Sequence, residues 1–216
     1  MKSSNQHILE YLIINKDYKD NVITVKSFYE LRNVIEDRYD KLGPGTKQDP
    51  IDFNDIDVSN LDSFYNDKNT YTGIFERTQF KYIDISEWDV SNIKSMRCMF
   101  YGCEKLKSVG DLSKWNVSNV KIMGGMFHHC KKFNQDISSW DVSKVTSMTN
   151  MFCGCKSFNQ DISNWDVSNV TIMKYIFYNC ESFNQDISGW NVSNVRHNDH
   201  IFHNCPIKEE YKPKFK

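Results

Sequence analysis

The chain has 216 residues, of which 39% are hydrophobic and 14% aromatic, and this composition can build a buried core. Its 27 basic and 28 acidic residues leave a formal net charge of −1, so no overall field draws the protein to nucleic acid or to an anionic membrane. The apolar stretch 8–14 is interrupted by Glu10, is too short to span a bilayer, and has no cleavage site after it. We therefore expect a cytoplasmic protein that neither binds nucleic acid nor inserts into a membrane.

Residues 1–50 are predicted to form an N-terminal cap. A weak strand pattern covers residues 22–25, and Ser27 and Glu30 then have the spacing of a capping box at the start of a helix. The apolar positions that follow have helical spacing and stop at the turn formed by residues 43–45. They are Phe28, Leu31, Ile35, Tyr39 and Leu42. This pattern predicts an amphipathic helix over about 27–42.

Five tryptophans, at positions 88, 115, 140, 165 and 190, divide the rest of the chain at intervals of 27, 25, 25 and 25 residues. A fixed period of this length predicts stacked units that bury their apolar sides only against one another. We call each unit a rung, name it by its tryptophan, and number its positions from that residue as zero. A degenerate first rung, residues 51–80, has Ile56 in place of tryptophan and an insertion at 67–73 that is expected to bulge as a loop. The predicted repeat region is 51–205.

Apolar residues recur in every rung at positions −3, +2, +5, +8, +11, +12 and +15, with few exceptions. Positions +5, +8, +12 and +15 are spaced like one stripe of a helix, which predicts a short helix over about +4 to +13 with the serine at +3 as its N-cap. The segment Asp-Ile-Ser-x-Trp-Asp-Val before it alternates between polar and apolar residues and predicts a short strand. Aspartates at −4 and asparagines at −6 are expected to hydrogen-bond backbone groups. The predicted fold is an α/β solenoid of about five 25-residue strand-turn-helix rungs with an N-terminal helical cap.

Position +15 is cysteine in all five rungs. The column consists of Cys103, Cys130, Cys155, Cys180 and Cys205. Free cysteine is among the most buried residue types, so we expect a column of reduced, inward-facing thiols, with disulfide or metal bonds between neighbouring rungs as the alternative. Residues 206–216 are predicted to be a polar C-terminal tail.

The repeat F-N-Q-D-I-S-x-W-D-V-S-N-V-x-x-M-x-x-M-F-x-x-C resembles the BspA-like bacterial surface-protein repeat, a divergent relative of leucine-rich repeats. The resemblance covers about residues 51–205. It implies a leucine-rich-repeat-like stack and, as in many members of that family, an adhesive or otherwise protein-binding role at the cell surface. The chain departs from the secreted members because no signal peptide or lipid-attachment cysteine is present near Met1.

No Gly-rich phosphate loop, nucleophile elbow or HExxH sequence occurs, so we expect no enzymatic activity and no cofactor. The predicted function is that of a monomeric protein–protein interaction module, possessing a rigid scaffold that presents variable side chains to a protein partner. One alternative is a metal-binding protein or enzyme that uses His197, His200 and His203 of the last rung. Another is a structural fragment of a larger surface adhesin array.

The candidate binding residues come from comparing the rungs with one another. Positions +6, +9, +10 and +13 vary most, and helical spacing would place them on the face opposite the apolar stripe. Aromatic and basic residues in these columns are of the types enriched at interfaces. The predicted binding residues are Arg97, Tyr101, His128, Lys174, Tyr175, Tyr178 and His200. A competing surface on the strand side includes the variable position −1.

Overall fold

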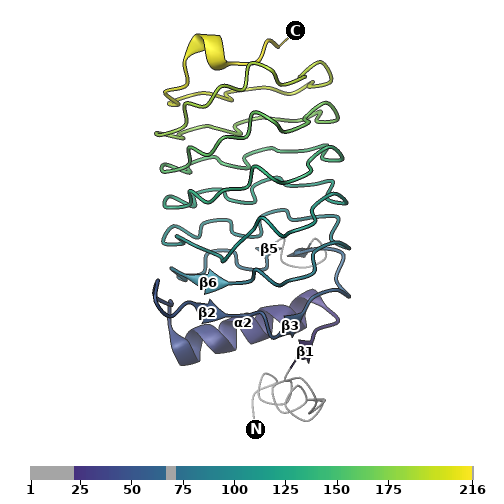
Figure 1. Ribbon diagram of the computed structural model, residues 1–216, viewed down its shortest axis with the longest axis vertical. Helices are drawn as coiled ribbons and strands as arrows, with labels where there is room; N and C mark the ends of the chain where they lie inside the picture. Colours follow the sequence, from purple (N-terminus) through teal and green to yellow (C-terminus); the bar gives the residue numbers. More distant parts are fainter. Residues whose placement is uncertain (1–21, 67–71, 216) are drawn as a thin grey trace.

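The computed structural model describes residues 22–66 and 72–215. Successive rungs lie on top of one another along the long axis, from the N-terminal end to the C-terminal end (Figure 1). Helix α2, Phe28–Leu42, lies across the N-terminal end of this stack. Of the helices in the described residues, none has the length and apolar character that a bilayer crossing requires.

Regular strands are short and are concentrated near the N-terminal end. β1 (Ile23–Thr24) pairs in parallel with β3 (Ile56–Asp57), β2 (Ile51–Asp52) pairs in parallel with β6 (Ile83–Asp84), and β4 (Tyr65–Asn66) pairs antiparallel with β5 (Thr72–Gly73). β1 confirms the strand predicted at residues 22–25. Of the predicted insertion only Thr72–Gly73 is described; residues 67–71 lie outside the described residues, as does the apolar stretch 8–14.

The predicted N-terminal helix is confirmed. Ser27 precedes α2 as its N-cap, and its Oγ accepts a hydrogen bond from the Glu30 N–H at 3.2 Å. The Glu30 carboxylate accepts from the Lys26 N–H at 2.8 Å, one residue before the position that a regular capping box uses. The buried face of the helix consists of Leu31, Val34 and Ile35. The helix therefore shields the apolar side of the first rung from water.

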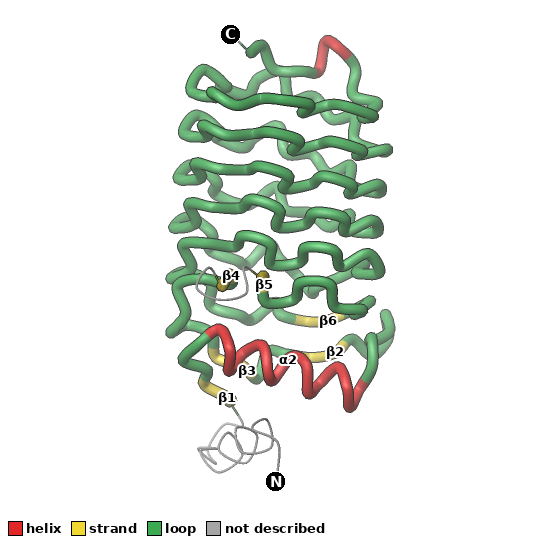
Figure 2. Tube along the Cα trace, turned by 180° about the vertical axis from the view of Figure 1, so that it is seen from behind, coloured by secondary structure: helices red, strands yellow, loops and turns green. Residues whose placement is uncertain are grey.

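The helices predicted over +4 to +13 are wrong, because within the described residues α2 is the only α-helix. Figure 2 shows the rungs as loops, and its second red segment is the short 3-10 helix Glu209–Tyr211 near the C-terminus. Each rung runs instead through tight turns. The N–H groups at +8, +10, +12 and +14 donate to carbonyls of the next rung; for example, the N–H of Phe127 donates to the Met151 carbonyl at 3.0 Å. Positions +10 and +14 have positive φ, as at Asn150 (57°) and Asn179 (56°), and an α-helix cannot contain this conformation.

The strand predicted before each of these helices is also wrong in rungs 115 to 190, where side chains close turns along the segment. The Asp136 carboxylate at −4 accepts from the Ser138 N–H at 2.9 Å, and the Asp141 carboxylate at +1 accepts from the Ser143 N–H at 3.0 Å. Such Asx turns bend the backbone away from an extended path. The serine at +3 is thus part of a turn and caps no helix. Parallel bridges between rungs run instead through position +7, from Ser63 to His197.

The expected hydrogen bonds of the asparagine column at −6 are confirmed, and they join neighbouring rungs. Asn134 Oδ1 accepts from the Asn159 N–H, and Asn159 Oδ1 accepts from the Asn184 N–H, both at 2.9 Å. At this position the asparagine side chain, and not a backbone carbonyl, accepts the hydrogen bond from the N–H group of the neighbouring rung.

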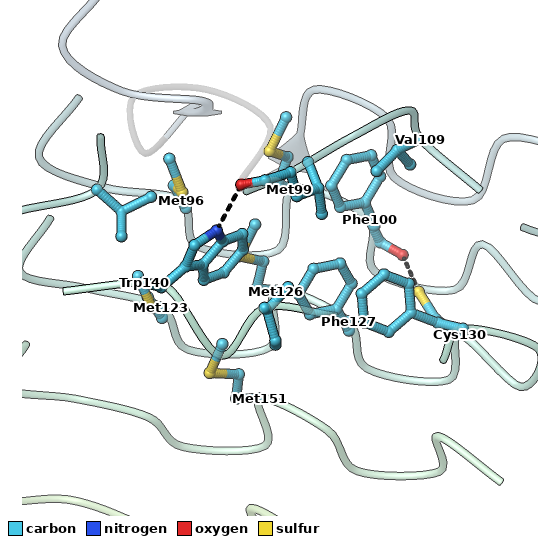
Figure 3. Close-up of a cluster of buried hydrophobic side chains, with 14 of the residues drawn as sticks. Met96, Met99, Phe100, Val109, Met123, Met126, Phe127, Cys130, Trp140 and Met151 are labelled. Atoms are coloured by element: carbon cyan, nitrogen blue, oxygen red, sulfur yellow. Dashed lines mark hydrogen bonds between the residues drawn. The ribbon is translucent and has the colours of Figure 1, made fainter. Parts of the chain in front are cut away.

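The predicted apolar columns form the core and are buried in almost every rung (Figure 3). In the last rung Val195, Phe202 and Cys205 are only half-buried, because among the described residues no further rung lies over them. The tryptophans also bind the rung before their own: each indole N–H donates to the carbonyl at −3 of that rung, as Trp140 does to Leu112 at 3.1 Å. The core is therefore held by directed hydrogen bonds as well as by apolar packing.

The cysteine column consists of free thiols, of which Cys103, Cys130, Cys155 and Cys180 are buried as predicted and Cys205 is half-buried. The thiol of Cys130 donates to the Phe100 carbonyl of the rung before it at 3.0 Å (Figure 3). Cys155 makes the same contact with the Phe127 carbonyl at 2.9 Å. Burial raises the pKa of the Cys103 thiol to about 12 and raises the pKa of the Cys130 and Cys155 thiols well above the usual value. These thiols are protonated donors at neutral pH.

The C-terminal segment is polar, as predicted, but it packs on the last rung. The Tyr211 carbonyl, in the 3-10 helix η1 (Glu209–Tyr211), accepts from the Ile187 N–H at 3.0 Å, and Ile207 is buried. This segment covers part of the end of the stack, where the last rung lacks a successor.

Replacing Trp165 with phenylalanine removes the indole N–H that donates to the Ile137 carbonyl at 3.2 Å and leaves unfilled volume in the core. We expect the free energy of unfolding, measured by urea denaturation, to fall by about 1–3 kcal/mol. The control Ser182→Ala, at an exposed position of the same rung, should change it by about 0.5 kcal/mol or less. Equal effects of the two substitutions would contradict the tryptophan's role between rungs.

Candidate functional site

A hollow of about 520 Å³ opens on the face formed by positions +10, +13 and +14 of rungs 115 to 190. We call it the His/Tyr hollow. It is lined by His128, His129, Asn150, Cys153, Tyr175, Tyr178, Asn179, His200 and His203. Four consecutive rungs therefore contribute to one surface.

The backbone beneath the hollow is fixed by the hydrogen bonds between rungs. The N–H of Asn150 donates to the Lys174 carbonyl and the N–H of Tyr175 donates to the Asp199 carbonyl, both at 2.9 Å. Tyr175 has a φ of 59°, a conformation that costs an L-residue roughly 1–2 kcal/mol and that glycine and asparagine adopt more readily. The turns thus hold an aromatic side chain at a position where the backbone alone would favour a smaller residue.

Aromatic rings lie against one another on both sides of the hollow. Tyr175 stacks on His200 with ring centroids 5.3 Å apart, and Tyr178 stacks on His203 at 4.9 Å. On the other side, His128 stacks on His129 at 4.3 Å. The intervening rung has no ring here and contributes Asn150 and Cys153.

The hollow carries little charge. None of its nine described lining residues is Asp, Glu, Lys or Arg. Burial, with a smaller effect from His129, lowers the pKa of His128 to about 4, so His128 is neutral at pH 7. Burial also raises the pKa of the Cys153 thiol to about 11. The hollow therefore presents the neutral imidazole of His128, tyrosine rings, asparagine amides and the protonated thiol of Cys153 to a ligand.

The structure brings together four of the seven predicted binding residues. His128, Tyr175, Tyr178 and His200 line the hollow. The other three lie outside its lining: the Arg97 guanidinium lies over the Tyr65 ring at 5.1 Å, the Tyr101 ring meets His128 edge-on at 4.6 Å, and Lys174 forms an ion pair with Asp199 at 2.8 Å.

The sequence prediction omitted position +14, which supplies His129 and Asn179. The comparison of the rungs had not counted this position among the most variable columns. A signal was available, because +14 is glycine or asparagine in the other rungs, at Gly102, Gly154 and Asn204. Those residue types favour positive φ and thus indicate a turn.

On the competing surface, side chains at position −1 contact the neighbouring rungs. Lys114 forms an ion pair with Glu87 at 2.6 Å, and the Asn164 amide donates to the Ser138 carbonyl at 3.0 Å. These side chains connect neighbouring rungs, and an exposed pair of this kind contributes little to stability.

The three histidines of the alternative metal site, His197, His200 and His203, are not gathered at one point in the structure. Within the part of the chain that the structure describes, no three His, Cys, Asp or Glu side chains are grouped closely enough to hold a metal ion. His197 belongs to the parallel bridges at +7, whereas His200 and His203 stack on tyrosines of the rung before. The expected helix, which would have placed His197 and His200 on one face, is absent.

A family model described as "Mycoplasma protein of unknown function, DUF285" matches the chain over residues 48–109, 68–167 and 103–212. The overlapping matches follow the repeated rungs. No curated protein and no solved structure matches the chain significantly.

Changing His128 to tyrosine, the residue at +13 in rungs 88 and 165, should flatten the pH dependence of stability. The folded state holds the pKa of His128 at about 4, below the usual 6.5, so the unfolded chain binds more protons between these values. His128 therefore costs stability as the pH falls from about 6.5 to about 4. Urea midpoints at about pH 7 and about pH 4.5 should differ less in the variant than in the wild type; equal differences would contradict the neutral, half-buried state of His128.

Proposed function

This chain belongs to the DUF285 family of Mycoplasma proteins of unknown function, a family of repeat-containing proteins, and we propose that it acts as a non-enzymatic module that binds a protein partner through the His/Tyr hollow. The observation that supports the proposal most directly is the convergence of variable side chains from four rungs on one hollow. The core columns repeat almost without change, whereas the side chains around the hollow differ from rung to rung.

The chemistry of the hollow suits a protein surface. Tyrosine and histidine rings offer apolar faces together with polar edges, and tyrosine is enriched among the residues that dominate binding energy at interfaces. The asparagines add neutral hydrogen-bonding groups. Because the backbone beneath is already fixed by neighbouring rungs, binding would order few additional groups and would lose little conformational entropy.

We further infer that the repeat is of the BspA-like, leucine-rich-repeat type and that the partner is met in an adhesive or host-interaction setting. Support comes from the motif that ends in Met-Phe-x-x-Cys and from the stacking of consecutive coils along one axis. In this proposal the likeness to leucine-rich repeats lies in the stacked architecture alone. The His/Tyr hollow is the surface that binds the protein partner.

Affinity capture with the full chain tests the proposal. Lysate or surface extract of the source organism is passed over immobilised wild-type protein and over the double variant Tyr175→Ala, Tyr178→Ala, and the bound proteins are quantified by mass spectrometry. A specific partner should be retained by the wild type and bind the double variant about tenfold less or weaker still, because buried interface tyrosines commonly contribute 2 kcal/mol or more.

The matched control is Tyr82→Ala, which removes a half-buried tyrosine outside the hollow. It should retain the partner as the wild type does. Loss of the partner from the control as well, or full retention by the double variant, would reject the hollow as the binding surface.

A further inference from the structure

The last rung, rung 190, keeps the conformation of an interior rung although no rung lies over it among the described residues. His200 at +10 and Asn204 at +14 both have a φ of 53°, in the same range as the interior turns. The Phe202 ring stacks on the Phe177 ring with centroids 5.9 Å apart, close to the 5.8 Å between Phe152 and Phe177. The outer surface of rung 190, which we call the open end, is therefore shaped like the surface that each interior rung offers to the next one.

The open end carries a row of backbone donors without acceptors. In interior rungs the N–H groups at +8, +10, +12 and +14 donate to the carbonyls at +7, +9, +11 and +13 of the next rung. In rung 190 the corresponding N–H groups have no acceptor within residues 22–66 and 72–215. They belong to Asn198, His200, Phe202 and Asn204. Because rung 190 keeps the interior conformation, these four donors point out of the stack at intervals of two residues.

Apolar side chains at the open end lack the cover that they have in interior rungs. Val195, Phe202 and Cys205 are half-buried, whereas the residues in the same columns of rung 165 are buried. Among the described residues, Phe202 stacks on a ring on one side only, and the Lys212 Nζ lies 5.5 Å from its ring centroid. The unpaired donors and the uncovered apolar columns thus belong to one surface.

The C-terminal segment follows the path of a further rung only at its beginning. The Lys208 N–H donates to Asn184 Oδ1 at 3.0 Å, just as the Asn184 N–H donates to Asn159 Oδ1 one rung earlier. The segment then turns at η1, and a hollow of about 400 Å³ opens between it and the last rung. Asn198 and Phe202, which carry two of the four donors, line this hollow. The open end is therefore accessible beside the C-terminal segment.

We propose that the open end docks a segment of a partner chain that follows the rung pattern from +5 to +15, Val-x-x-Met-x-x-Met-Phe-x-x-Cys. This inference is independent of the His/Tyr hollow. A segment with this pattern covers the same surface in each interior rung, where it supplies carbonyls at alternate residues and buries the apolar columns. Addition of a partner's backbone to an unpaired edge is an established mode of recognition. The partner that fits is another repeat protein of this type, with a rung whose carbonyls are unpaired.

A second copy of this chain does not fit the open end. Two open ends brought together would place donors against donors. The opposite end of the stack is closed by α2, because the Arg32 guanidinium donates to the Gly73 and Ile74 carbonyls at 3.2 and 2.8 Å. Ile74 corresponds to position +11, since the N–H of Phe75 donates to the next rung as the +12 N–H groups do. The helix thus takes an acceptor that an open end would require.

A titration with a synthetic peptide that copies residues 169–180 tests the inference. The peptide is added under reducing conditions to the full ¹⁵N-labelled chain, and the backbone amide signals and their hydrogen exchange are followed by NMR. The signals of Asn198, His200, Phe202 and Asn204 should shift saturably, and their exchange should slow because the N–H groups acquire acceptors. A control peptide with Met173→Ser, Ile176→Ser and Phe177→Ser keeps every carbonyl but lacks the apolar side chains. It should bind at least about tenfold more weakly.

The variant Phe202→Asp places a carboxylate on the apolar part of the open end. It should bind the peptide at least about tenfold more weakly than the wild type, because the incoming apolar side chains would desolvate the charge. The matched control Ser139→Asp adds the same charge at an exposed position of rung 140 and should bind as the wild type does. If Phe202→Asp does not fold, Val195→Asp at the half-buried +5 position replaces it.

Absence of saturable shifts in the wild type, or equal binding of the two peptides, would overturn the inference. Shifts centred on Asn150 and Cys153 would also overturn it, because the peptide would then bind the His/Tyr hollow. If the four amide signals move with protein concentration alone, a second copy occupies the open end and the choice of partner is wrong. None of these outcomes affects the proposed function, which partner capture with the Tyr175 and Tyr178 double variant tests separately.

Discussion

Hydrogen bonds between consecutive rungs are the constraint on which this structure depends. Four backbone N–H groups in each interior rung, at +8, +10, +12 and +14, find their acceptors on the next rung. Tryptophan indoles and cysteine thiols add donors directed at carbonyls of the rung before. Because buried backbone groups must be paired, an isolated rung would leave these donors and acceptors to water and would also expose its methionine and phenylalanine side chains.

The sequence predicted what is buried better than it predicted the path of the backbone. The apolar columns, the N-terminal helix and the cysteine column were correct because burial depends on the identity of the repeated residues. The helix at +4 to +13 was wrong because the spacing of +5, +8, +12 and +15 fits a helix and also fits a coil of tight turns. Glycine and asparagine at +14 distinguish the two, since Gly102, Gly154 and Asn179 adopt positive φ. The leucine-rich-repeat relationship stays a prediction.

Only part of the candidate site could be predicted from the sequence. Comparison of the rungs identified +10 and +13 as variable, and His128, Tyr175, Tyr178 and His200 do gather at one hollow. Position +14 was not among the columns chosen as most variable, so His129 was missed. The stacking of rings across rungs follows from the rung spacing, which no single rung reveals. A regular stack thus brings side chains that differ from rung to rung together on one surface.

Amide hydrogen exchange measured by NMR on the full chain tests the dependence of each rung on the next one. In rung 140 the N–H groups of Met148, Asn150, Phe152 and Gly154 donate to rung 165, whereas in the last rung the described residues offer no backbone acceptor to the N–H groups of Asn198, His200, Phe202 and Asn204. The account predicts strong protection of the first four and fast exchange of the second four. Equal protection in the two rungs, as hydrogen bonds within each rung would produce, would contradict it.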